Sequence, residues 1–136
     1  MSMNAYQLFY ETYRDIADIY ILYILEAHFV EKDDVGKIIG GWPIGKLFNY
    51  PQHKTLQDRC AMVEVLLDTY HPTIPILLDT MANEFQNAYR PWPDRAYVFH
   101  QGHIQYMARI NDDGSRNAMW CDEIAPMLDA FRTHTD

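Results

Sequence analysis

A carboxylate and an imidazole follow directly on a hydrophobic run near the start of the chain. The segment "YILEAH" ends in Glu26, Ala27 and His28. Polar groups that end a buried strand often mark a functional site, and imidazole suits proton exchange because its pKa lies near neutral pH. On periodicity alone, His28 is more simply a strand-end residue that hydrogen-bonds to the backbone. Both interpretations stand at this point.

The cysteines and the other histidines give weaker signals. Cys60 and Cys121 lie far apart and form no CxxC pair, so we predict two free thiols, with neither a disulfide framework nor a zinc site. His100 and His103 flank a predicted turn and could share a metal ion. No third ligand is predictable, so the sequence indicates no metal site and no cofactor.

Aromatic residues are abundant, with ten tyrosines and three tryptophans. Trp42 and Trp92 could line a pocket for a small aromatic ligand. Such side chains more often pack in the core or on a hairpin.

The elements that must position these residues follow from the periodicity. Tyr6, Phe9, Tyr10 and Tyr13 recur at helical spacing, and a Gln-Gly pair stands between two alternating runs, as in a tight hairpin. We expect helices over 4–17, 56–69, 82–89 and 118–132, strands over 18–25 and 74–79, a hairpin over 96–110, and a long surface loop over 29–54.

This order, α-β-α-β-α-β-β-α, predicts a single α/β domain over residues 1–136. It corresponds to the carboxyl-terminal part of a thioredoxin-like fold, in which helices flank a central mixed sheet.

Composition excludes several classes of partner. The net charge of −8 offers no basic surface to nucleic acid or to an anionic membrane. No apolar run is long enough to span a bilayer, and the first residues lack the pattern of a signal peptide. We therefore expect a cytoplasmic protein.

Several motifs in order give a family resemblance. "YILEAH", "GGWP", "HKTLQDR" and "IPILLDTMANEFQNAYRPWPDRAYVF" together resemble the iodothyronine deiodinase family and its bacterial relatives, which are thioredoxin-like thiol or selenol oxidoreductases. The similarity covers most of the chain. It implies a redox function and a small aromatic or thiol substrate.

The resemblance also implies roles for single residues. Glu26 and His28 match a Glu-Ala-His beside the nucleophile, where the histidine contacts substrate or exchanges a proton. His53 matches a second histidine, and Arg95 in "WPDR" matches an arginine that holds a substrate carboxylate. Pro75 matches a proline, usually cis, that faces the active-site cysteine. Trp42 of "GGWP" joins the predicted substrate-binding residues.

One family feature has no counterpart. The nucleophilic Cys or selenocysteine precedes the helix that residues 4–17 resemble, so we expect this chain to be catalytically incomplete. Three hypotheses remain open: an oxidoreductase whose nucleophile is encoded upstream, a non-catalytic binding or assembly module, and a subunit completed by a partner strand. We also expect a homo-oligomer that covers the aromatic stripe of the first helix.

Overall fold

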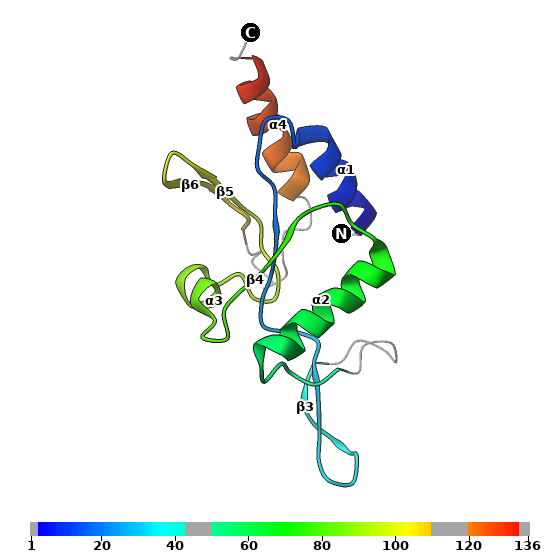
Figure 1. Cartoon of the computed structure of the whole chain (residues 1–136). Coiled ribbons are helices and arrows are strands. Elements are labelled where there is room, and N and C mark those ends of the chain that lie inside the picture. The colour runs from blue at the N-terminus through cyan, green and yellow to red at the C-terminus, as the bar shows by residue number, and fades with distance from the viewer. Residues whose placement is uncertain (1–2, 43–49, 110–119, 134–136) are drawn as a thin grey trace. The chain divides into compact units, whose positions relative to one another are not determined.

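The computed structural model describes residues 3–42, 50–109 and 120–133, which fall into two compact units. The terminal unit comprises Met1–Ile21, Tyr70–Pro75 and Asp94–Asp136, and the central unit comprises Leu22–Thr69 and Ile76–Pro93. Both contain helices and short strands (Figure 1), which confirms the mixed α/β class. The single domain stays a prediction.

The terminal unit packs two helices and a hairpin around aromatic side chains. Its elements are α1 (Met3–Tyr13), β5 (Tyr97–His100), β6 (His103–Met107) and α4 (Trp120–Thr133). Tyr13 of α1 is buried against Ile124 and Leu128 of α4. The rings of Tyr6 and Trp120 stack with centroids 5.6 Å apart. Helix α4 therefore supplies the cover that the sequence analysis assigned to a second copy, and oligomerisation stays a prediction.

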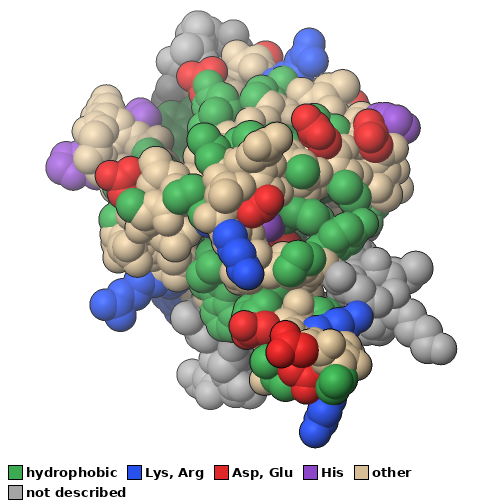
Figure 2. Space-filling view, turned by 60° about the horizontal axis from the view of Figure 1, so that its bottom comes forward, with side chains coloured by type: hydrophobic (Ala, Val, Ile, Leu, Met, Phe, Trp, Pro, Cys, Tyr) green, Lys and Arg blue, Asp and Glu red, His purple; other side chains and the backbone are tan. Residues whose placement is uncertain are grey.

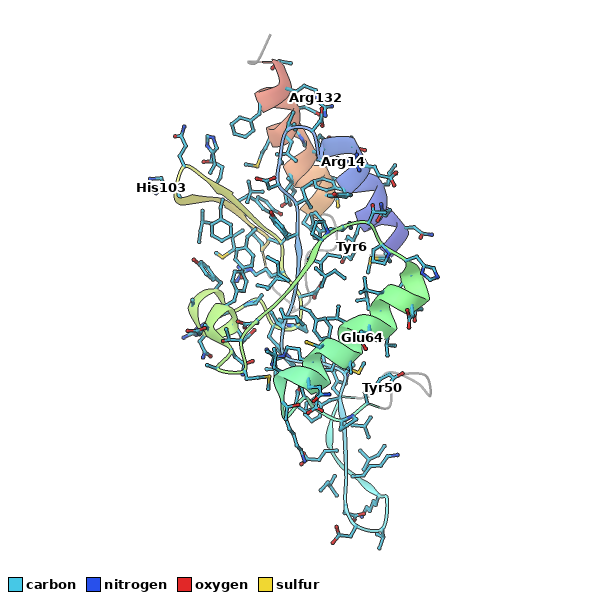
Figure 3. The ribbon with its side chains drawn as sticks, viewed as in Figure 1. Tyr6, Arg14, Tyr50, Glu64, His103 and Arg132 are labelled. Atoms are coloured by element: carbon cyan, nitrogen blue, oxygen red, sulfur yellow. The ribbon has the colours of Figure 1, made fainter. Side chains whose placement is uncertain are left out.

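The predicted hairpin of the terminal unit is confirmed. Strands β5 and β6 are antiparallel, and His100 and His103 are the last opposed pair. Gln101 and Gly102 form the turn with φ of 50° and 77°, the mirror-image geometry that matches strand twist. His103 lies at the exposed tip of the hairpin (Figure 3). The centroid of the His100 ring lies 4.8 Å from that of the Phe131 ring.

The central unit contains a strand pair and two helices that the sequence predicted. Strand β1 (Ile21–Tyr23) pairs with β4 (Ile76–Leu78). The hydrogen bonds Ile21 N to Pro75 O and Asp79 N to Tyr23 O advance along both strands together, so the pair is parallel. Helices α2 (Leu56–Tyr70) and α3 (Glu84–Tyr89) lie close to their predicted bounds.

The expected surface loop over 29–54 needs correction. Strands β2 (Val30–Lys32) and β3 (Ile38–Gly41) form an antiparallel hairpin within it. Asp33 closes the turn, because its Oδ1 accepts from the N–H groups of Val35 and Lys37. The glycines and charges that suggested a loop therefore make a short hairpin, and residues 43–49 of the expected loop lie outside the description.

The sheet is smaller than the sequence suggested. The described strands form three two-stranded sheets, where we expected one central mixed sheet. The three residues of β1 are only half-buried, although the hydrophobic run over 18–25 suggested a buried strand. Apolar composition identifies a strand, but it does not fix how many neighbours the strand pairs with.

Helix α2 begins with a capping box. Thr55 Oγ1 accepts from the N–H of Asp58 at 3.1 Å, and Asp58 Oδ2 accepts from the N–H of Thr55 at 2.9 Å. The buried face of α2 runs through Arg59 and Val63, while Leu56 is exposed. Its core-facing side is thus partly polar, which the apolar pattern alone did not reveal.

Hydrophobic side chains remain exposed over much of the surface, as the face in Figure 2 shows. Among residues 3–42, 50–109 and 120–133, no helix has the length and apolar character needed to cross a membrane. The cytoplasmic location stays a prediction. The predicted start of the last helix at 118 lies outside the described residues.

Candidate active site

The Glu-Ala-His segment follows β1 and has an irregular backbone conformation. This conformation brings its polar groups close to one another. Ala27 and Val30 are buried and anchor the segment. Oε2 of Glu26 accepts from the hydroxyl of Tyr23 at 2.7 Å, and Oε1 accepts from the N–H of His28 at 2.9 Å. The carboxylate is therefore held at both oxygens.

Gln52, which is 26 residues further along the chain, forms two hydrogen bonds with the backbone of Glu26. Its Oε1 accepts from the N–H of Glu26 at 3.1 Å, and its Nε2 donates to the carbonyl of Glu26 at 2.9 Å. The same Oε1 also accepts from the N–H of His53 at 3.2 Å. Gln52 thus ties the strand that carries Glu26 to the segment that carries His53.

His53 is a buried imidazole, with only 7% of its surface exposed. Neither Nδ1 nor Nε2 has a hydrogen-bond partner among the described residues. Its ring centroid lies 5.5 Å from that of Tyr23. Burial lowers the pKa of His53, and the charge of Arg59 lowers it further, against opposing effects of Glu26 and Asp58. A neutral imidazole with free nitrogens can accept a proton.

Tyr23 stands between the carboxylate and the imidazole. Burial raises the pKa of Tyr23 well above its usual value, and the hydrogen bond to Glu26 raises it further. Its hydroxyl therefore remains protonated at neutral pH and serves as a donor. Tyr23, Glu26 and His53 together form what we call the proton cluster.

His28 and Trp42 form a second, more open part of the site. His28 Nδ1 lies 2.9 Å from the carbonyl oxygen of Trp42, and the two rings lie 5.0 Å apart. Trp42 is 56% exposed. The backbone bond orients the imidazole and leaves Nε2 for a ligand, while the exposed indole offers an aromatic surface.

Arg59 supports the cluster from α2. It is 1% exposed, and its NH1 donates to the carbonyls of Asp79 and Thr80 at 2.8 Å. NH2 donates to Oδ1 of Asn83 at 2.9 Å. The buried cation ties α2 to the chain that follows β4, and its charge favours the neutral form of His53.

Two predicted site residues belong to the terminal unit. The carbonyl of Pro75 accepts from the N–H of Ile21, and the bond before Pro75 is trans, because the cis bond of the described chain is Trp92–Pro93. Arg95 Nε donates to the carbonyl of Ala108 at 2.6 Å, and its guanidinium lies over the Tyr97 ring. The cis peptide expected at Pro75 is therefore wrong, while the substrate roles stay predictions.

Neither cysteine is placed as an activated nucleophile. Burial raises the pKa of Cys121 to about 11, and the neighbouring Asp122 acts in the same direction. Cys60 is a half-buried free thiol within α2. In the described part of the chain, no three histidine, cysteine or acidic side chains lie close enough together to hold a metal ion.

The sequence predicted Glu26, His28, Trp42 and His53 as site residues, and all four lie in the central unit. It indicated no role for Tyr23, Gln52 or Arg59. Tyr23 stands three residues before Glu26, and Gln52 directly precedes His53. Their closeness in sequence to a predicted site residue could have pointed to Tyr23 and Gln52. For Arg59, the sequence offered only its place four residues before Val63, on the same face of the helix.

Comparison with known proteins identifies the family of the chain. A family model described as iodothyronine deiodinase matches residues 1–119. The chain is 30% identical over 109 residues to type I iodothyronine deiodinase of Xenopus laevis, covering 80% of this chain and 39% of that protein.

Thyroxine 5-deiodinases give similar values. The Mus musculus protein is 32% identical over 136 residues, covering 97% of this chain and 41% of its own length. The Sus scrofa protein is 34% identical over 113 residues, covering 82% of this chain and 34% of its own length. The chain thus spans about two fifths or less of these relatives. The chain belongs to the iodothyronine deiodinase family.

Proposed function

We propose that this chain is the proton-handling and substrate-positioning part of a deiodinase-like oxidoreductase with a thioredoxin-like fold. The observation that carries the proposal is the proton cluster: a carboxylate bonded to a protonated Tyr23, beside a buried imidazole with two free nitrogens. Such a set can hold a proton and deliver it to a reacting atom.

Reductive removal of iodine from an aromatic carbon needs such a proton. A thiolate or selenolate takes the iodine, an S–I or Se–I bond forms, and the C–I bond breaks. The electron pair stays on the carbon, which is reduced and takes up a proton, while the sulfur or selenium is oxidised. The proton cluster supplies that proton, and the imidazole of His28 with the indole of Trp42 contacts the aromatic ring.

The proposal assigns the nucleophile to a thiolate or selenolate other than Cys60 and Cys121. The raised pKa of Cys121 and the position of Cys60 within α2 support this assignment. The 136-residue chain alone is therefore catalytically incomplete. Iodinated phenols are the proposed substrate class, because the relatives are named deiodinases and two of those cited are named for thyroxine.

A chimera tests the proposal. The segment of the mouse thyroxine 5-deiodinase that aligns with this chain is replaced by the chain itself. Iodide release from an iodinated phenol is then measured with dithiothreitol as reductant. We expect release by the chimera and none by the isolated chain. A folded chimera without release, or turnover by the isolated chain, would contradict the proposal.

A binding or assembly module is the second candidate, and the strand pairing favours it. Within the described residues, β1 and β4 pair only with each other. A two-stranded sheet has two open edges, and such edges accept a further strand from a partner or a second copy. A folded but inactive chimera, together with a dimer of the isolated chain in light scattering, would favour this candidate.

A further inference from the structure

An open pocket of about 430 Å³ lies in the central unit, and none of its lining residues belongs to the proton cluster. Its lining residues are Leu25, Gln86, Asn87, Arg90 and Trp92. Four of these five residues belong to helix α3 and the segment that follows it. The helix is labelled in Figure 1. The volume falls in the range of small-molecule sites.

The spare hydrogen-bonding capacity of the pocket consists mainly of donors. Oε1 of Gln86 already accepts from the N–H of Trp92 at 3.1 Å, and Nδ2 of Asn87 donates to the carbonyl of Ala82 at 3.0 Å. Among the described residues, nothing accepts from the guanidinium of Arg90, the indole N–H of Trp92 or Nε2 of Gln86. A pocket of this kind favours a ligand that brings acceptors.

The backbone of Arg90 is unusual for a residue with a side chain, as it is at His71, Asn83 and Gln101. Arg90 ends α3 in the left-handed region, with φ 53° and ψ 52°, a position that glycine usually occupies. A side chain here reduces stability, and such residues concentrate at ligand sites. The arginine is therefore unfavourable for the helix end, although it is one of the residues that line the pocket.

We propose that this pocket binds a small organic carboxylate with an aromatic or apolar body. The fork of Arg90 matches a carboxylate in two parallel hydrogen bonds, and Leu25 with the Trp92 ring contacts the apolar body. A lining with a single cation, Arg90, favours a monoanion over a polyphosphate. The site is independent of proton transfer by the cluster.

The test follows binding of phenylacetate to the intact chain by NMR, through the indole N–H signal of Trp92, assigned with Trp92→Phe. We expect saturable shifts in the millimolar range or below. Phenylacetamide, the neutral isostere, should bind at least about tenfold more weakly, because it forms no charge-assisted pair.

Two substitutions examine Arg90. Arg90→Gln and Arg90→Gly should each weaken phenylacetate binding about tenfold or more, while Arg90→Gly raises the urea midpoint because glycine suits the left-handed position. Lys54→Gln, an exposed charge change in the same unit, should leave binding unchanged. Glu26→Gln should also leave it unchanged, which separates this proposal from the proposed function.

The proposal is overturned if phenylacetate gives no saturable shift. It is equally overturned if phenylacetamide binds as tightly, or if both Arg90 variants keep the affinity of the wild-type chain.

Discussion

The hydroxyl of Tyr23 donates to Oε2 of Glu26 at 2.7 Å, across only three residues of sequence. The irregular backbone after β1 makes this possible, since a continued strand would separate the two side chains along its length. The bond fixes the carboxylate and keeps the phenol protonated.

Tyr23→Phe tests the energetic weight of that bond. Removing the donor from a partly buried carboxylate should reduce the free energy of unfolding by about 1 to 2 kcal/mol. Urea denaturation measures the change. Tyr20→Phe is the matched control, because Tyr20 is exposed, and it should change stability by less than about 0.5 kcal/mol. Equal effects of the two substitutions would show that the bond contributes nothing specific.

The lowered pKa of His53 should make the folded protein less stable as the pH decreases. Its pKa is lowered in the folded state by burial and by Arg59, so the unfolded chain binds more protons below the ordinary histidine pKa. Stability from this group is complete above about pH 6.5 and falls as pH decreases, by at most about 1.4 kcal/mol per pH unit.

The matched variant for this dependence is His53→Phe, which keeps a ring and removes both unpartnered nitrogens. Unfolding should be measured between pH 5 and 7.5 for both proteins. We expect a shallower acid slope for the variant and near-equal stability at neutral pH. Identical slopes would place the protonation change on another group.

Gly41 should be intolerant of a side chain. Its φ is +96°, and a Cβ would overlap the carbonyl of Phe29, which also accepts from the N–H of Trp42. Gly41→Ala should therefore cost more than about 2 kcal/mol and displace Trp42 from His28. Gly36→Ala, with φ +81° but open space around it, should cost only about 1 kcal/mol. The prediction fails if the two variants unfold at the same urea concentration.

The cap of α2 gives a simpler comparison. Thr55→Ala removes the acceptor for the N–H of Asp58 and should cost about 1 kcal/mol. Thr69→Ala, in the last turn of the same helix, removes a hydroxyl that bonds back to Val65 and should be neutral or slightly stabilising. Thermal unfolding of both variants distinguishes a cap from a general loss of hydroxyl groups.

Local signals in the sequence predicted the helices and the β5–β6 hairpin, because each depends on neighbouring residues. The Gln101-Gly102 turn is a case of this kind. The β2–β3 hairpin was missed because its glycines and charges resemble a loop. The number of strands that pair with β1 depends on residues more than fifty positions away, which periodicity does not report.

The site shows the same division. Glu26, His28 and His53 followed from motif similarity, whereas the brace from Gln52 and the buried charge of Arg59 depend on contacts between distant segments. The sequence predicted no role for Arg59. Arg59 can be buried because the carbonyls of Asp79 and Thr80 accept hydrogen bonds from its guanidinium.

The most direct test of the proton cluster is the rate of iodide release by the chimera with and without Glu26→Gln. Loss of the carboxylate should lower the rate about 100-fold, as expected for removal of a proton-transfer group. Glu64→Gln, on the exposed side of α2 (Figure 3), is the matched control and should retain the full rate. A chimera carrying Glu26→Gln that releases iodide as fast as the unsubstituted chimera would contradict the central claim.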